Sequence, residues 1–193
     1  MYEIGNRQLL FGGMGRLTES SVLNMKNKSH AVTAEIVMPE KGDAEGVIVA
    51  QGGLTGGWSL YAKGGIAKYC YNFYGIDRYY VASTSKLPSG QHQLRMEFTY
   101  DGGGLGKGGT VALYLDGTEI GRGRVEKTEE FVFSADETLD LGQDHGAPVT
   151  EDYSTKTFNG SVKWVELDVG ADAEEADHEL RAKDRFSLAM GLQ

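Results

Sequence analysis

The sequence predicts an all-β protein, an antiparallel two-sheet sandwich of the jelly-roll type followed by a C-terminal α-helix. Three observations support this fold class. Short segments in which apolar and polar residues alternate recur along the chain, as expected for strands with one buried face. The 193 residues include 28 glycines, which mark turns between these segments, and only 3 prolines. A helical pattern occurs only near the C-terminus, so the roughly ten predicted strands are joined by turns and loops.

The clearest strand pattern lies in the stretch from Gln93 to Arg124. Apolar residues alternate over 94–100 and again over 110–115, and Asp116-Gly117 is a type I′ turn signal before a third strand at 118–123. This predicts an antiparallel three-stranded meander. The glycine-rich segment 101–109 is followed by a strand, whereas phosphate-binding loops lead into a helix. We therefore interpret it as a broad hairpin loop and not as a nucleotide site.

The chain divides into a lead-in, a sandwich domain and an appendage. Residues 1–29 show little alternation, and we expect them to lie across a sheet without forming part of one. Residues 30–170 form the sandwich domain. Outside the meander, its strands are predicted at 30–38, 46–51, 58–63, 66–73, 78–82, 131–133 and 158–169.

Residues 171–193 are predicted to form the helical appendage. Asp172 can cap the helix with Glu175 at the third position, and Gly191 ends it. The apolar stripe of this helix has no surface to cover within a small closed sandwich. We therefore expect self-association, or docking on a neighbouring surface, through Phe186 and Met190.

Composition excludes several classes of partner. The formal net charge of −9 argues against binding to nucleic acid or to anionic membranes, because both favour basic patches. No apolar run approaches the roughly 20 residues that span a bilayer, and the N-terminus shows no signal pattern, so we expect a soluble chain. The single cysteine, Cys70, excludes an internal disulfide and a cysteine-based zinc cluster. Its place in an alternating strand favours a packed side chain over a nucleophile.

The acidic segment 134–153 is a candidate metal site. Asp136, Asp140 and Asp144 recur every four residues, and calcium favours several carboxylate and carbonyl oxygens gathered by an irregular loop. The spacing matches no established calcium motif. The alternatives are a solvated acidic loop and a loop that packs against a partner domain. Calcium is the one cofactor that the sequence suggests.

Aromatic residues are dense between residues 58 and 80, which suggests a second candidate site. Sugars bind to exposed aromatic faces flanked by hydrogen-bonding groups, so Trp58, Asn72 and Tyr74 could form a lectin-like site for a glycan. The alternative is that the aromatic residues fill the core, because half of the side chains of a sandwich strand face inward.

Two further patterns bear on catalysis and binding. Glu166-Leu-Asp168 resembles part of the Glu-x-Asp-x-x-Glu signature of concanavalin-like glucanases, in which alternate strand residues place carboxyl groups on one face. The third acid is missing, and an acidic solvent face explains the pair equally well. The four histidines are far apart in sequence, and His145, in Gln-Asp-His-Gly, is the one we consider as a site residue.

Several longer motifs resemble the C-terminal domain of large bacterial arylsulfatases. They are the segments 46–53, 56–61, 71–73, 98–109 and 133–138, together with 26–30 and 148–153. The likeness runs from about residue 6 to the end of the chain. It implies a β-sandwich of the concanavalin-like or laminin-G-like kind.

The same resemblance implies a non-catalytic function. Arylsulfatases act through a cysteine or serine in a Cys-x-Pro-x-Arg type motif, but Cys70 is followed by Tyr71-Asn-Phe-Tyr. No catalytic residue is therefore carried over, and we expect no sulfatase turnover by this chain alone. We expect a bacterial accessory domain, cytoplasmic or periplasmic, that packs against a sulfatase catalytic domain or an oligomer partner. The alternatives are a carbohydrate-binding module and a glycosidase.

Overall fold

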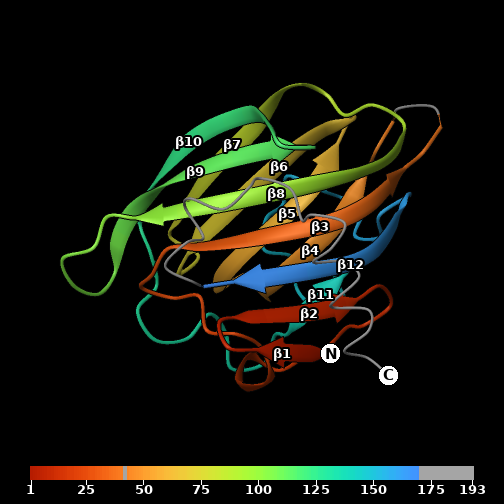
Figure 1. Cartoon of the computed structure of the whole chain (residues 1–193). Coiled ribbons are helices and arrows are strands. Elements are labelled where there is room, and N and C mark those ends of the chain that lie inside the picture. Colours follow the sequence, from red (N-terminus) through yellow and green to blue (C-terminus); the bar gives the residue numbers. More distant parts are fainter. Residues whose placement is uncertain (41–42, 170–193) are drawn as a thin grey trace.

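The computed structural model describes residues 1–40 and 43–169. In this part of the chain two antiparallel sheets face each other (Figure 1). The larger sheet has the strand order β1-β2-β12-β3-β8-β9-β10, and the smaller has the order β11-β4-β5-β6-β7. The strands are β1 (Tyr2–Ile4), β2 (Arg7–Phe11), β3 (His30–Met38), β4 (Gly46–Gly53), β5 (Gly56–Lys63), β6 (Ile66–Phe73), β7 (Asp77–Lys86), β8 (Gly90–Tyr100), β9 (Lys107–Leu115), β10 (Thr118–Lys127), β11 (Leu139–Leu141) and β12 (Ser161–Asp168). One short 3₁₀ helix, η1, spans Glu19–Ser21.

The main hydrophobic core lies between the two sheets. In β3, Val32, Ala34 and Ile36 alternate with residues of the other face and are completely buried. Trp58 and Tyr69 of the smaller sheet belong to the same core, and their rings stack with centroids 6.4 Å apart. The predicted antiparallel two-sheet sandwich is therefore confirmed.

The predicted meander is also confirmed. β8, β9 and β10 pair in succession, with Leu94 opposite Leu115 and Leu115 opposite Thr118. The glycine-rich loop connects β8 to β9 directly, as expected for a hairpin. β10 continues to Lys127, beyond the predicted end, after an irregularity in its pairing between Glu119 and Gly121.

The prediction for residues 1–29 is wrong, because this segment contributes two strands to the larger sheet. β2 pairs with β12, and β1 pairs with β2 at the edge of the sheet. Gln8, Leu9 and Leu10 are buried in succession, so β2 lacks the alternation from which a strand is recognised. After β2 the chain passes very close to β12 at Gly12, where a Cβ atom would lie 1.9 Å from the Val162 carbonyl oxygen. The sandwich therefore begins well before residue 30.

Residues 131–133 do not form the predicted strand. The Phe133 backbone N–H donates to Oε2 of Glu19 at 3.0 Å, in place of a neighbouring strand, and Phe131 is 75% exposed. The predicted C-terminal helix, with Phe186 and Met190, lies outside the described residues. Within 1–40 and 43–169, no helix is both long and apolar enough to cross a membrane.

Candidate ligand-binding site

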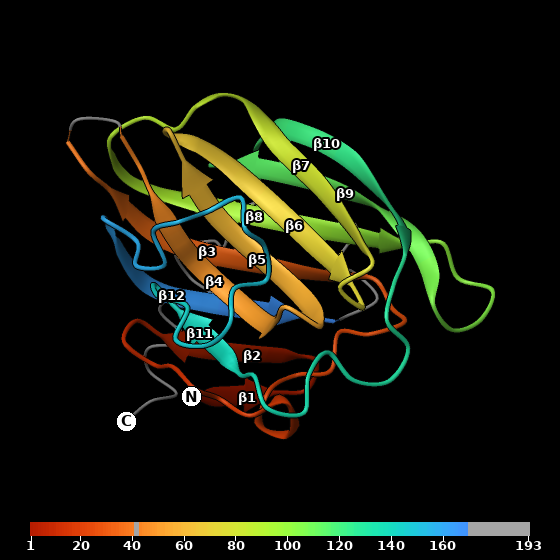
Figure 2. The same ribbon diagram turned by 180° about the vertical axis from the view of Figure 1, so that it is seen from behind.

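A long loop, residues 142–160, folds over the outer face of the smaller sheet. Figure 2 shows it in blue and cyan, passing across β4 and β5. Val149 and Tyr153 of the loop pack in a second buried cluster with sheet residues that include Tyr61 and Cys70. Cys70 is a free, fully buried thiol, which agrees with the interpretation of this residue as a packed side chain.

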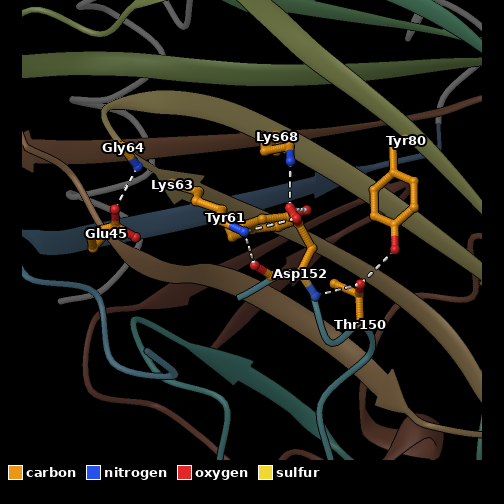
Figure 3. A network of polar contacts seen from close by, with 8 residues as sticks. All are labelled: Glu45, Tyr61, Lys63, Gly64, Lys68, Tyr80, Thr150 and Asp152. Carbon is orange, nitrogen blue, oxygen red and sulfur yellow. Dashed lines mark hydrogen bonds and ion pairs between the residues drawn. The ribbon is translucent and has the colours of Figure 1, made fainter. Parts of the chain in front are cut away.

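Asp152 fastens this loop to the sheet (Figure 3). Its carboxylate accepts a hydrogen bond from the Tyr61 hydroxyl at 2.7 Å and pairs with Lys63 at 3.0 Å and with Lys68. Burial raises the pKa of Asp152, but the hydrogen bonds from Lys68, Tyr61 and Lys63 outweigh burial and hold the pKa well below its usual range. Because both carboxylate oxygens are engaged, we assign Asp152 to anchoring the loop.

A pocket of about 370 Å³ opens at the base of the anchored loop. Three distant parts of the sequence line it: Gly13 after β2, residues 141–145 around the end of β11, and residues 157–162 leading into β12. Both ends of the loop 142–160 therefore contribute residues to the wall of the pocket.

Backbone contacts hold the two ends of the loop together. The Phe158 N–H donates to the Gly142 carbonyl at 2.9 Å, and the Gly142 N–H donates to the Ile48 carbonyl of β4 at 2.8 Å. Gly46, at the start of β4, has a φ of +102°, and a Cβ atom there would lie 2.1 Å from the Thr157 carbonyl oxygen. Only glycine permits both this backbone conformation and this approach. The pocket wall therefore depends on β4 as well as on the loop.

Asp140 fixes the orientation of His145, which is one of the residues that line the pocket. Asp140 is 3% exposed, and its Oδ1 lies 2.9 Å from Nδ1 of His145 and 2.5 Å from the Arg16 backbone nitrogen. The His145 backbone N–H donates to Oδ2 of Asp140 at 3.2 Å. Because a carboxylate only accepts hydrogen bonds, Nδ1 of His145 carries a proton, and Nε2 is the ring nitrogen left to contact a ligand. The His145 side chain is 39% exposed, so Nε2 can meet a ligand.

Gly15 makes room for this pair. A Cβ atom at Gly15 would lie 2.9 Å from both Oδ1 of Asp140 and Cε1 of His145. A larger residue at Gly15 would therefore require Asp140, His145 or both to shift.

Trp58, Asn72 and Tyr74 do not form the predicted lectin-like site, because two of the three side chains are buried. Trp58 is 1% exposed, and its indole N–H donates to Gln51 inside the sandwich at 3.1 Å. Asn72 is fully buried, where its amide donates to the Gly53 carbonyl at 2.8 Å. Tyr74 alone is exposed, at 40%. Trp58 belongs to the core, which was the alternative interpretation.

The predicted calcium ligands do not converge either. Asp136 is exposed, Asp140 holds His145, and Asp144 is buried and accepts a hydrogen bond from the Tyr153 hydroxyl at 2.7 Å. Burial raises the pKa of Asp144, although the bond from Tyr153 opposes this shift. Within the described residues, no group of three or more histidine, cysteine or acidic side chains is placed to hold a metal ion.

The acids considered for glycoside hydrolysis lie on β12. Glu166 and Asp168 are each 2% exposed, and Asp168 pairs with Arg7 at 3.0 Å. Two alternate residues of one strand do share a face, as predicted. Because both side chains are buried, however, their carboxyl groups are not accessible to a substrate.

Comparison with known proteins gives information on the fold. No family model matches the chain, and no curated protein matches its sequence. Among solved structures, the carbohydrate-binding module CBM40 of the Ruminococcus gnavus IT-sialidase, bound to α2,3-sialyllactose, matches with a TM-score of 0.55 and 14% identity. The match covers 88% of this chain and 94% of that module. At this identity the match shows similarity of the β-sandwich fold.

Laminin structures show the same architecture. The LG1-3 region of the laminin α2 chain matches with a TM-score of 0.55 and 14% identity, over 80% of this chain and 30% of that one. Domains LG4-5 of the mouse laminin α1 chain match with a TM-score of 0.53 and 16% identity, over 92% of this chain and 43% of that one. The two-sheet sandwich of this chain is therefore similar in fold to these laminin domains.

Sequence reasoning found part of the pocket and missed the rest. His145 was singled out, and Asp140 was noted as a metal ligand when it is in fact the partner of His145. Gln143, Thr157 and Ser161 were missed, because polar residues in irregular segments carry no pattern. The one available signal was the number of glycines near these segments, which mark places where chains approach closely.

Proposed function

We propose that this chain is a carbohydrate-binding module that acts without catalysing a reaction. The observation that carries the proposal is the likeness to the sialidase CBM40, which extends over nearly the full length of both chains. Because the identity is only 14%, this likeness supports a similar fold but does not identify a binding site. The binding site is therefore inferred from the residues of this chain.

The pocket supplies the second support. Sugar and other small-ligand sites combine apolar surface with a few convergent polar groups. The residues that line the pocket include the apolar Leu141, Phe158 and Val162 and the hydrogen-bonding His145 and Ser161. Because the acids on β12 are buried, binding is favoured over hydrolysis of a glycan.

A glycan array tests the proposal. The purified chain, labelled with a fluorophore, should bind at least one class of immobilised oligosaccharide, and the same oligosaccharide in solution should compete for it. Sugar release from bound glycans should not be detected by chromatography. Absence of binding to every oligosaccharide by the folded chain would contradict the proposal, and release of sugar would point to the glycosidase alternative.

A second candidate function is the accessory domain of an arylsulfatase-like protein, and one observation favours it. Large apolar side chains are exposed on loops between strands, among them Leu54 at 46%, Ile76 at 75% and Leu105 at 57%. Exposed apolar residues on loops suit contact with a neighbouring domain. Under this function, Ile76→Asp should leave the chain folded and prevent its co-purification with a sulfatase catalytic domain expressed in trans.

A further inference from the structure

We propose that the pocket beside His145 binds uncharged sugar hydroxyls, so that the chain selects neutral glycans over acidic ones. This inference rests on the proposed carbohydrate-binding function and adds to it the place of binding and the class of ligand. Three properties of the pocket lead to it: the hydrogen-bonding groups, the distribution of charge, and the size.

Beside His145, the hydrogen-bonding groups that line the pocket are uncharged amide and hydroxyl groups. Gln143, Thr157 and Ser161 line the pocket with His145, and an amide and two hydroxyls can both donate and accept. The side chains of Gln143, Thr157 and Ser161 form no hydrogen bond to another described residue, so they are available to a ligand. Because Nδ1 of His145 lies 2.9 Å from Oδ1 of Asp140, Nε2 is the ring nitrogen left for a ligand group such as a sugar hydroxyl, which can both donate and accept.

The distribution of charge disfavours an anionic ligand. Among the described residues, those that line the pocket include no lysine or arginine, the residues with which proteins recognise carboxylate and sulfate groups. The carboxylate of Asp140 lies 2.9 Å from Nδ1 of His145, and its negative charge would repel an anion. A sialic acid or a sulfated sugar would therefore lose its hydration without gaining a counter-charge.

The size suits a short saccharide. At about 370 Å³ the pocket lies near the small end of the range of roughly 300–1,000 Å³ typical of small-molecule sites. Val162 is a half-buried apolar residue of the lining, whereas Phe158 and Leu141 are 5% and 4% exposed, so we expect most contacts with a sugar to come from the polar groups. We expect one or two sugar rings to be held, with the rest of the glycan in solvent.

Two pocket variants and one matched control test the inference. His145→Ala removes the imidazole group that Asp140 orients, and Ser161→Trp fills the pocket from an exposed residue at the start of β12 without altering the pair of Asp140 and His145. The control is His92→Ala, because His92 forms a similar pair, 2.6 Å from Asp116, away from the pocket. All three proteins are compared with the wild type on an array of neutral oligosaccharides and their sialylated and sulfated counterparts, after circular dichroism has shown that they fold.

The wild type and His92→Ala should bind neutral oligosaccharides and bind the acidic counterparts more weakly. Calorimetry with the strongest neutral ligand should show an affinity about tenfold lower for His145→Ala, as expected for one lost hydrogen bond, and no binding for Ser161→Trp. Binding that requires a carboxylate or sulfate group, or binding that both pocket variants retain, would overturn this inference while the carbohydrate-binding function stands. If the folded wild type binds no oligosaccharide, both proposals fall.

Discussion

The buried carboxyl group of Glu129 should make the stability of this protein depend on pH in a way that one substitution removes. Glu129 follows β10 and is completely buried, and its Oε1 accepts the Tyr74 backbone N–H at 2.8 Å. Its Oε2 has no hydrogen-bond partner among the described residues. Burial raises its pKa from 4.5 to about 7, with the bond from Tyr74 and the positive charge of Lys26 opposing the shift and the negative charge of Glu19 adding to it.

The magnitude and the sign follow from this pKa. The folded state binds the proton more tightly than the unfolded chain, so the stabilisation is fully present below pH 4.5 and is lost as the pH rises to about 7. Linkage between these two pKa values gives a loss of about 2.5 kcal/mol in the free energy of unfolding between pH 5 and pH 8. Glu129→Gln keeps the shape and the acceptor for Tyr74 but cannot ionise, so it should lack this part of the pH dependence.

Urea unfolding at pH 5, 6, 7 and 8, followed by tryptophan fluorescence, measures the effect. The difference in the free energy of unfolding between Glu129→Gln and the wild type should shift by about 2.5 kcal/mol in favour of the variant from pH 5 to pH 8. Glu126→Gln is the control, because the Glu126 side chain is 63% exposed and the variant should follow the wild type. Parallel pH profiles for Glu129→Gln and the wild type would refute the reasoning.

Three further predictions concern buried residues. Burial lowers the pKa of His30 from 6.5 to about 4, so stability present above pH 6.5 is lost as the pH falls, and His30→Gln should avoid about 2 kcal/mol of the loss that the wild type shows between pH 7 and pH 5 in urea unfolding. Trp58→Ala should lower the free energy of unfolding by about 3–5 kcal/mol, because it empties a core position that is 1% exposed; a variant of normal stability would contradict this placement. Burial raises the pKa of the Cys70 thiol to about 12, so a thiol reagent at pH 8 should label the protein only after unfolding, and rapid labelling of the native protein would contradict it.

Much of the fold could be predicted because its signals are local. The alternation in 94–100 and 110–115 predicted β8 and β9 to within a few residues, and Asp116-Gly117 marked the turn before β10. In β6, the alternating strand pattern favoured a packed side chain at Cys70, and the structure has Cys70 in the buried cluster under the covering loop. Each of these features depends on residues that are close together in the chain.

The candidate site could not be predicted to the same extent. Alternation assigns the residues of a strand to two faces but does not show which face is buried in the core. The sequence was therefore compatible with Trp58 either as a sugar-binding residue or as a core residue. The pair of Asp140 and His145 is completed by a backbone N–H from Arg16, 124 residues away from Asp140. The spacing of residues in the sequence does not predict such a long-range contact.

The sequence by itself determined the class of fold, the order of most strands and the absence of the arylsulfatase catalytic motif, because period-two alternation, glycine turns and short motifs are properties of neighbouring residues. Tertiary structure alone decided that β2 completes the larger sheet and that three segments, at 13, 141–145 and 157–162, enclose one pocket. The physical reason is that strand pairing and loop docking are contacts between distant residues, and such contacts are chosen by the packing of the whole sandwich.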